Sequence, residues 1–371
     1  MKRTSLLTTT LIALGATVLA SLSGFAAAPP TTWTGGSATT ANWSDSGNWS
    51  AGVPGSGGVV VHFSGNTRLT INDDGPSNGN YSDLYFDSGA GSFVINQVGS
   101  ALYGLNGNLY NLSLNPQTIN IAMQNIFGAP GGKRTFTLTN GSSLVINGVI
   151  SQLSGAVNSF NLTGTGTAPY GTLTLSGANT FSGGLTNNNC TLNINNAQAL
   201  GTAGAFGINS GSIINNTSGG SITTVSYPQF WNGSFTFAGA NNLNLGTGAV
   251  ALEANVTVTA NAITLTVGGI ISGAYKLTKA GAGTLQLGGA NAYTGDTTVS
   301  AGTLQMGAAG VMPNGAGYGN LSPTGTLDLN TFSQTIRAIS PDEVSVGSTS
   351  TNRKSWVLKC SSPMAQSISV P

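Results

Sequence analysis

The side chains that could perform acid–base or metal chemistry are few and scattered. The single histidine, His62, lies in the alternating run Val59–Phe63. A lone histidine in such a run is more often a surface or edge residue than a catalyst. The two cysteines, Cys190 and Cys360, lie far apart and match no metal-binding spacing. We therefore expect no multi-histidine or cysteine metal site and no cofactor, and we interpret Cys190 as a small buried hydrophobe rather than half of a disulfide.

Two pairs of carboxylates could serve a polysaccharide-cleaving enzyme, which needs clustered acids on one face. Asp83 and Asp87 are four positions apart, so both can share one face of a strand, where they could also hold a cation. Asp73 and Asp74 lie in Asn-Asp-Asp-Gly-Pro, which is typical of a turn. Solvated strand residues and a turn are the simpler interpretations. The sequence therefore assigns no catalytic residue, and we expect no enzymatic activity.

Composition restricts both the fold and the partners. The chain has 371 residues, of which 11 are Lys or Arg and 10 are Asp or Glu, giving a net charge of +1. A nucleic-acid-binding protein would show a basic footprint, so nucleic acid is not an expected partner. With 55 glycines and few helix-forming charged residues, a helical architecture is excluded. The 39% of hydrophobic residues argues against disorder.

Residues 1–28 have the pattern of a secretory signal peptide. Met1-Lys-Arg3 is a positively charged start, residues 6–22 are uncharged and mostly apolar or small, and Ala26-Ala-Ala28 follows. Cleavage after Ala26 and cleavage after Ala28 both fit. An uncleaved anchor is the alternative, but the run is shorter than the roughly 20 residues that a membrane span requires. We therefore expect an extracellular or cell-surface protein whose mature chain has no transmembrane segment.

Short alternating strands fill residues 55–336, which we predict to form one domain. Examples are Phe136–Thr139, Thr172–Leu175 and Ile263–Val267, each with apolar residues on one face and Thr or Asn on the other. Glycine, asparagine and serine separate the strands, whose starts recur at roughly 8–12 residues. This spacing is typical of a sandwich, a barrel or a solenoid.

An internal repeat favours the solenoid. Residues 171–194 align with residues 283–306, and 11 of the 24 positions are identical. Repeated strand–turn–strand units bury their apolar faces by stacking on one another. We therefore predict a parallel β-helix with about 20–25 residues per coil, in which asparagine side chains stack in hydrogen-bonded ladders. A β-sandwich is the alternative, although it leaves the long-offset repeat unexplained.

Three of the five tryptophans, Trp33, Trp43 and Trp49, concentrate in residues 29–54. The first unit of a repeat rod must cover an exposed core and exposed strand edges, and aromatic side chains suit that task. We therefore predict a Trp-rich N-terminal cap. The alternative is that these three rings make glycan contacts, because tryptophan faces stack on pyranose rings.

Residues 277–306, from Leu277-Thr-Lys-Ala-Gly-Ala-Gly283 onward, resemble the autotransporter-associated β-strand repeat, or passenger-associated transport repeat. Its pattern reads Lys-x-Gly-x-Gly-Thr-Leu-x-Leu-x-Gly-x-Asn-x-Tyr-x-Gly-x-Thr-x-Val-x-x-Gly-x-Leu. Residues 171–194 match less closely, with Leu185 and Cys190 where the pattern has Thr and Gly. The resemblance implies a right-handed parallel β-helix that is exported by a Gram-negative bacterium and displayed or released at its surface.

The resemblance also implies a role without catalytic residues. We expect a secreted or cell-surface, adhesin-like structural passenger whose partners are surface glycans or host or matrix ligands. The alternative function is that of a polysaccharide-binding or polysaccharide-cleaving β-helix protein. Residues after 306 leave no room for the membrane barrel of a complete autotransporter, so we expect secretion machinery to act in trans.

Residues 337–371 form an atypical tail. Charged residues concentrate there, and Ser340-Pro341 and Ser362-Pro363 interrupt strand continuation. We interpret the tail as foreign to the solenoid, the result of a shifted or shortened reading frame. The alternative is a C-terminal cap that buries Trp356, Val357 and Leu358 on the last coil.

Overall fold

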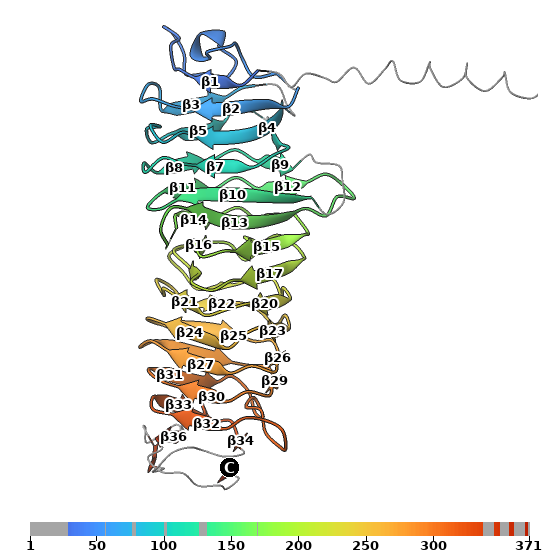
Figure 1. Ribbon diagram of the computed structural model, residues 1–371, viewed down its shortest axis with the longest axis vertical. Coiled ribbons are helices and arrows are strands. Elements are labelled where there is room, and N and C mark those ends of the chain that lie inside the picture. Colours follow the sequence, from blue (N-terminus) through green and yellow to red (C-terminus); the bar gives the residue numbers. More distant parts are fainter. Residues whose placement is uncertain are drawn as a thin grey trace, which may run out of the picture.

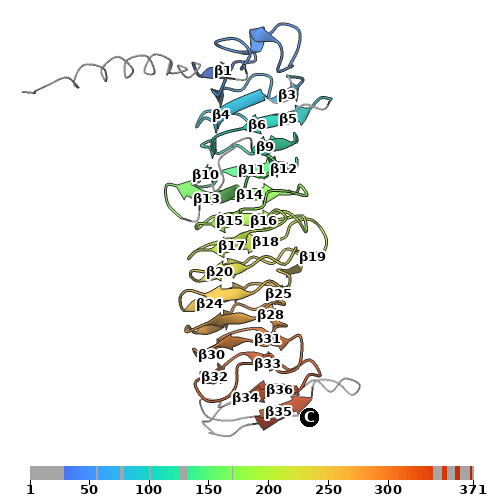
Figure 2. The same cartoon turned by 90° about the vertical axis from the view of Figure 1, so that its right-hand side faces the viewer.

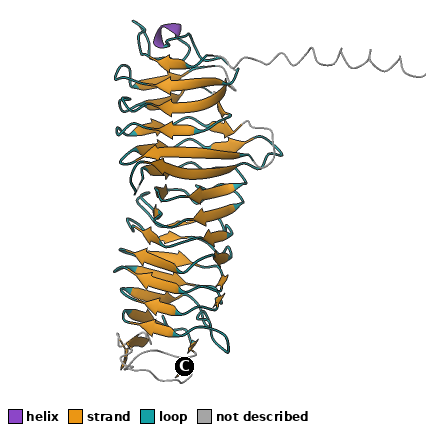
Figure 3. Cartoon of the chain, viewed as in Figure 1, coloured by secondary structure: helices purple, strands orange, loops and turns teal. Residues whose placement is uncertain are grey.

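The computed structural model describes residues 29–336, apart from 56, 76–78, 100–101, 126–131 and 169, together with three short strands in the tail. The predicted signal peptide, 1–28, lies outside these residues. The described chain forms a long rod of stacked coils (Figures 1 and 2). Strands and turns build it, and a three-residue 3-10 helix, η1 (Ser46–Asn48), is the only helix among the described residues (Figure 3).

Three sheets run along the rod. The 15-stranded sheet contains β1 (Thr31–Trp33), β2 (Val59–Phe63), β4 (Gly79–Phe86), β6 (Tyr103–Leu105), β7 (Leu109–Asn111), β9 (Met123–Asn125), β10 (Lys133–Thr139), β12 (Ile150–Gln152), β13 (Ser159–Thr165), β15 (Gly184–Asn187), β17 (Ala205–Ile208), β20 (Gln229–Trp231), β23 (Val250–Leu252), β26 (Ile271–Gly273) and β29 (Ala292–Tyr293). The 12-stranded sheet contains β3 (Thr70–Asp73), β5 (Val94–Gln97), β8 (Gln117–Ile119), β11 (Ser143–Ile146), β14 (Thr172–Leu175), β16 (Thr191–Ile194), β18 (Ile213–Asn215), β21 (Phe235–Phe237), β24 (Val256–Ala260), β27 (Leu277–Ala280), β30 (Thr297–Val299) and β32 (Leu321–Pro323).

The third sheet has eight strands and begins in the second half of the rod. It contains β19 (Ile222–Thr223), β22 (Leu243–Asn244), β25 (Thr264–Val267), β28 (Thr284–Leu287), β31 (Thr303–Met306), β33 (Thr326–Asp328), β35 (Ser345–Ser348) and β36 (Trp356–Lys359). A separate two-stranded sheet pairs β34 (Thr335–Ile336) with β37 (Ile368–Ser369).

Along the coils from β1 to β33, strands pair in parallel with strands one coil later, as the repeat predicts. Leu173 is opposite Leu192, and Leu285 is opposite Leu304. The 12-stranded sheet marks about 11 turns of a β-solenoid. The prediction of an all-β parallel β-helix is therefore confirmed, and the β-sandwich alternative is wrong. Coil length varies more than expected, because Ser143 pairs with Thr172 while Thr172 pairs with Thr191.

Alternation along each strand fills the interior of the rod. In β24, Val256, Val258 and Ala260 are buried while Thr257 and Thr259 are partly exposed. Stacking in register places Leu265 above Leu285 and Val267 above Leu287, so the cores of successive coils form continuous columns. Burying each large apolar side chain contributes roughly 1.5–3 kcal/mol. Hydrophobic burial along the whole rod therefore holds the coils together.

Glycine is required at one corner because the backbones of neighbouring coils touch there. A Cβ atom on Gly269 would lie 1.8 Å from the carbonyl oxygen of Gly248, and one on Gly248 would lie 1.8 Å from that of Tyr227. Gly289 repeats the contact one coil later, with 2.4 Å to the oxygen of Gly269. No side chain fits at these distances, so this column of glycines allows the backbones of neighbouring coils to approach closely.

Both ends of the described rod continue its sheets. At the first coil, β1 pairs in parallel with β2, in the region 29–54 that the sequence predicts to be a cap. At the other end, β36 pairs antiparallel with β33, and β35 pairs antiparallel with β36. The side chains of these tail strands lie outside the described residues, so the burial predicted for Trp356, Val357 and Leu358 stays a prediction. The predicted domain boundaries also stay predictions.

Candidate ligand-binding surface

A column of rings stands on the outer face of the 15-stranded sheet near the first coils. His62 on β2, Tyr85 on β4 and Tyr110 on β7 occupy successive registers. The rings of His62 and Tyr85 stack with centroids 4.7 Å apart, and those of Tyr85 and Tyr110 stack with centroids 4.3 Å apart. Because each ring covers its neighbour, the column presents ring edges rather than faces to the exterior.

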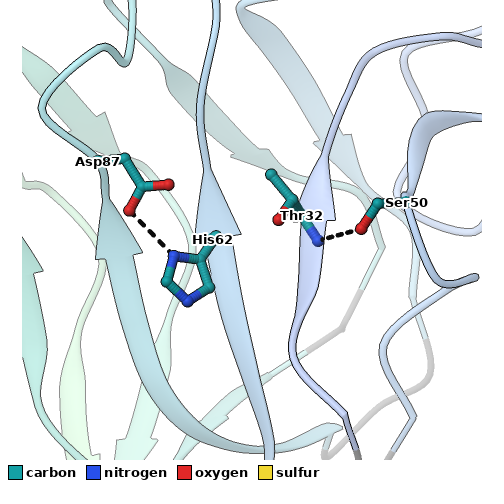
Figure 4. Close-up of polar contacts among 4 residues, drawn as sticks. All are labelled: Thr32, Ser50, His62 and Asp87. Carbon is teal, nitrogen blue, oxygen red and sulfur yellow. Dashed lines mark hydrogen bonds and ion pairs between the residues drawn. The ribbon is translucent and has the colours of Figure 1, made fainter.

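His62 is held by a carboxylate that follows β4. Its Nδ1 lies 2.9 Å from Asp87 Oδ1, with both side chains about one-third exposed (Figure 4). On the neighbouring β1, the amide of Thr32 donates to Ser50 Oγ at 2.9 Å. The interpretation of His62 as a surface residue on a strand is therefore confirmed. The carboxylate of Asp87 fixes the orientation of the imidazole on the surface of the rod.

Asp83 and Asp87 both point outward, on either side of Tyr85, as their spacing predicts. They serve different partners, because Asp83 Oδ1 accepts a hydrogen bond of 2.6 Å from the amide of Asn108 while Asp87 holds His62. Burial, Tyr110 and the two carboxylates raise the pKa of Tyr85 to about 12. Among the described residues, no three His, Cys, Asp or Glu side chains gather as metal ligands would.

Asp73 and Asp74 differ in burial, because Asp73 ends β3 facing the interior whereas Asp74 follows the strand and is partly exposed. Asp74 accepts hydrogen bonds from the amide and the hydroxyl of Ser44, at 2.8 and 2.7 Å, and so ties the first coil to the next. Asp73 is only 3% exposed and accepts from the amide of Gly75. Burial raises the pKa of Asp73 to about 6. The alternation of β3 places Asp73 inside, and the turn sequence alone did not indicate this.

The three tryptophans predicted as a cap or as glycan contacts lie inside the first coil. Trp33 and Trp43 are 0% exposed, and Trp49 is 5% exposed. Trp49 packs edge-on against both, with ring centroids 5.1 and 4.6 Å away, and its Nε1 donates to the carbonyl oxygen of Trp43. Stacking on a sugar requires an exposed ring face. None of the three offers one, so their packing accounts for their positions.

Cys190, one of the two cysteines, is buried as a free thiol, and burial raises its pKa to about 12. The interpretation of Cys190 as a small buried hydrophobe is therefore confirmed. Cys360 lies outside the described residues.

Ladders of amide side chains run along the outer corners, as the sequence predicts for asparagine. Asn147 donates to Asn120, which donates to Asn96, with N–O distances of 2.9 and 2.8 Å. A second ladder uses glutamine, since Gln286 donates to Gln305 and Gln305 to Asp328. These chains of hydrogen bonds hold successive coils in register.

The repeat pattern has a structural explanation in the second half of the rod. Lys279 is 1% exposed, and its Nζ donates to the carbonyl oxygens of Ala280, Gly281 and Ala301. Burial lowers the pKa of Lys279 to about 8. Asn291 accepts a hydrogen bond from the amide of Ile271, one coil earlier. The Lys and Asn of the repeat pattern thus form hydrogen bonds that link the backbone of one coil to the next.

Comparison with known proteins matches the same segments of the chain. The family model described as passenger-associated-transport-repeat matches residues 170–188 and 277–306. The chain carries passenger-associated transport repeats. Both segments carry an inward asparagine, Asn179 or Asn291, that accepts a hydrogen bond from a backbone amide one coil earlier, and the second segment also carries Lys279. The predicted resemblance is therefore confirmed, with the first match ending at residue 188 rather than 194.

A curated relative is similar over a longer stretch of the chain. The chain is 29% identical over 308 residues to the protein named "Adhesin BmaC autotransporter" of Brucella suis biovar 1 (strain 1330). That match covers 76% of this chain and 8% of the relative, so the chain spans a small part of that protein. No solved structure matches. A membrane-crossing helix is not found among the described residues.

Sequence reasoning missed the ring column. Residues 62, 85 and 110 are separated by 23 and 25 positions, which is the length of one coil here. That spacing, once a coil length is assumed, is a signal that could have grouped His62, Tyr85 and Tyr110 in advance.

Proposed function

We propose that this chain is a non-enzymatic, surface-displayed passenger rod of the adhesin type. The observation that carries the proposal is that the passenger-associated transport repeats are built into the rod as ordinary coils. Asn291 and Lys279 form hydrogen bonds to the backbone there, which supports a structural role rather than substrate binding. The similarity to an autotransporter adhesin supports the same role.

The use of the carboxylates supports a structural role over cleavage. Asp83 holds the amide of Asn108, Asp87 holds His62, and Asp74 holds Ser44. A glycoside hydrolase needs two carboxyl groups that face one bond across roughly 5–10 Å. Each of these three acids instead fastens one coil to another.

In this role the rod lies outside the cell, where its long outer surface meets ligands on surfaces or host tissue. A parallel solenoid suits this task because its outer faces vary freely while the inner columns hold the fold.

The test uses the purified full chain on fluorescent beads. We expect saturable retention on at least one member of a panel of fixed host cells and matrix-coated surfaces, with competition by excess soluble chain. Beads that carry the heat-denatured chain are the matched control. Retention equal to this control on every surface would contradict the proposal. Release of soluble sugar from polysaccharides, lost in Asp83→Asn, would replace it with the enzymatic alternative.

A further inference from the structure

A groove of about 320 Å³ lies at the corner where the chain passes from the 15-stranded to the 12-stranded sheet. Three coils contribute to it, through the turns that follow β13, β15 and β17. Its lining side chains are uncharged, and each ends in a hydroxyl or an amide. They are Thr163, Tyr170, Asn188, Asn189, Asn209 and Ser210.

Tyr170 is fixed in this groove by close packing. Its amide donates to the carbonyl oxygen of Asn189 at 3.2 Å. Its side chain occupies space that only a glycine leaves open, because a Cβ atom on Gly164 would lie 2.0 Å from Tyr170 Cγ. Part of the side chain packs on the core of the rod, and the remainder lines the groove. The tyrosine is therefore held in place before any ligand arrives.

The asparagines of the groove are also fixed. Asn209 donates its side-chain amide to Asn188 Oδ1, and Asn232 donates to Asn209 Oδ1 at 2.6 Å. Asn188 Nδ2 donates to the carbonyl oxygen of Leu162 at 3.0 Å. Because these hydrogen bonds determine which end of each amide is the donor, the orientations of Asn188 and Asn209 at the groove are defined. Because these side chains are already ordered in the free protein, they lose little conformational entropy when a ligand binds.

We propose that this groove binds a neutral sugar unit of a glycan, a proposal that rests on the adhesin-like function above and names its ligand class. A pyranose presents an apolar C–H face and a rim of hydroxyls. A tyrosine ring suits the first, and amide and hydroxyl groups suit the second. The volume lies at the small end of ligand pockets, which span roughly 300–1,000 Å³, so the groove accommodates one or two rings.

The absence of charge in the lining selects against acidic sugars. A carboxylate or sulfate ester is recognised in proteins by Arg or Lys, which form charge-assisted hydrogen bonds. Neither residue lines this groove. The site is therefore expected to prefer hexoses and N-acetylhexosamines over sialylated, uronic or sulfated glycans.

The tyrosine of the groove has no counterpart in the second repeat. In the repeat 112 residues later, Ala282 occupies the position of Tyr170 and Gly281 that of Pro169. The asparagine contact between coils is present in both repeats, at Asn179 and Asn291, whereas the tyrosine ring is present only in the first. This local departure from the pattern is what a binding site grafted onto a repeating scaffold requires.

The experiment screens the purified full chain on a glycan array that holds neutral, sialylated and sulfated members, followed by calorimetry with the neutral hits. We expect binding to neutral glycans that falls at least about tenfold in Tyr170→Ala. Ser210→Tyr fills the groove from an exposed position and should also abolish binding, which covers the case that Tyr170→Ala does not fold. Tyr275→Ala is the matched control, since Tyr275 is 39% exposed and lies elsewhere on the rod.

Three outcomes would overturn the proposal: no binding to any neutral glycan, preference for acidic glycans, or binding that persists in Ser210→Tyr. The bead assay separates this failure from failure of the proposed function. If beads carrying wild type and beads carrying Ser210→Tyr adhere equally, the adhesin-like function stands and the groove is not its binding site. If no beads adhere but the chain still binds sugar, the groove stands as a sugar site and the adhesin-like function is contradicted.

Discussion

Tyr293 Oη and Thr297 Oγ1 lie 2.6 Å apart inside the rod, in the second repeat. Both side chains are buried, and burial raises the pKa of Tyr293, so the phenol stays neutral. The equivalent residues of the first repeat are Phe181 and Leu185, which are also buried. One repeat thus buries a hydrogen-bonded pair and the other an apolar pair. The first repeat therefore lacks both hydroxyl groups: Phe181 stands in place of tyrosine, and Leu185 stands where the repeat pattern has threonine.

This pairing predicts strong coupling between the two positions. Tyr293→Phe leaves the Thr297 hydroxyl buried without its hydrogen-bond partner, and Thr297→Val leaves the Tyr293 phenol buried without its partner. Each single change should lower the free energy of unfolding by about 1–3 kcal/mol. The double variant removes both polar groups and should regain most of that loss. Urea unfolding of the four proteins gives the coupling free energy. Single effects that simply add in the double variant would show that the hydrogen bond does not link the positions.

The glycine corner predicts a steric cost. Gly269→Ala forces a methyl group against the carbonyl oxygen of Gly248, so we expect a loss of about 1–3 kcal/mol in the free energy of unfolding. Gly220→Ala is the matched control, because nothing lies within 4 Å of its added Cβ. Thermal melting of both variants compares them. Equal melting temperatures would mean that the coils can separate at this corner without cost.

Asp73 predicts a pH dependence of stability near the first coils. Its folded pKa of about 6 lies above the ordinary value of 3.8, so the native state binds its proton more tightly than the unfolded state. Stability from this group is complete below pH 4 and is lost as pH rises through 6. The shift corresponds to a loss on the order of 3 kcal/mol. Asp73→Asn should therefore be more stable than wild type at pH 7.

The comparison of Asp73→Asn with wild type isolates this group, because other carboxylates titrate equally in both proteins. Melting temperatures measured from pH 3.5 to 7.5 should converge at the acid end and separate above pH 5. A constant difference across the range would contradict a titrating Asp73.

The pairing of β36 with β33 predicts that the tail covers the end of the solenoid, in contrast to the interpretation of residues 337–371 as foreign to it. Removing residues 337–371 uncovers the edge of β33, and exposed parallel edges pair with other chains. We expect the shortened protein to self-associate, which light scattering would detect. A monomeric rod with unchanged melting would instead support the interpretation of the tail as foreign to the solenoid.

The parallel coiling could be predicted because alternation and stacking leave separate marks in a sequence. The Thr–Leu alternation of residues 172–175 and its echo at residues 284–287 indicate strands that stack on similar neighbours. The structure bears this out, since both segments pair with a strand 19 residues later. The asparagine ladders could be predicted for the same reason.

The assignment of strands to sheets could not be predicted. Thr172–Leu175 lies in the 12-stranded sheet, whereas its echo, Thr284–Leu287, lies in the eight-stranded sheet. Coils between them differ in length, so the repeat returns on a different face of the rod. Turns of variable length decide this, and their residues carry no periodic signal.

The site was harder to predict than the fold. Composition favoured a tryptophan cap, with glycan contacts as the alternative, and Trp33, Trp43 and Trp49 are buried in the core of the first coil. The groove at Tyr170 needs three coils at once, and only their stacking places Asn188 and Asn209 beside it. Spatial neighbours a coil apart do not show in a local motif.

The direction of the ladder hydrogen bonds has a mechanical consequence. They point along the rod, from one coil to the next, so tension between the two ends loads the coils in series rather than side by side. Under such a load the weakest coil opens alone. Val256 and Leu277 are one coil, or 21 residues, apart. That length extends to about 70 Å, against a rise of about 4.8 Å in the stack. A rod fixed at one end and gripped at the other would therefore lengthen in steps and absorb a sudden pull before its grip is broken.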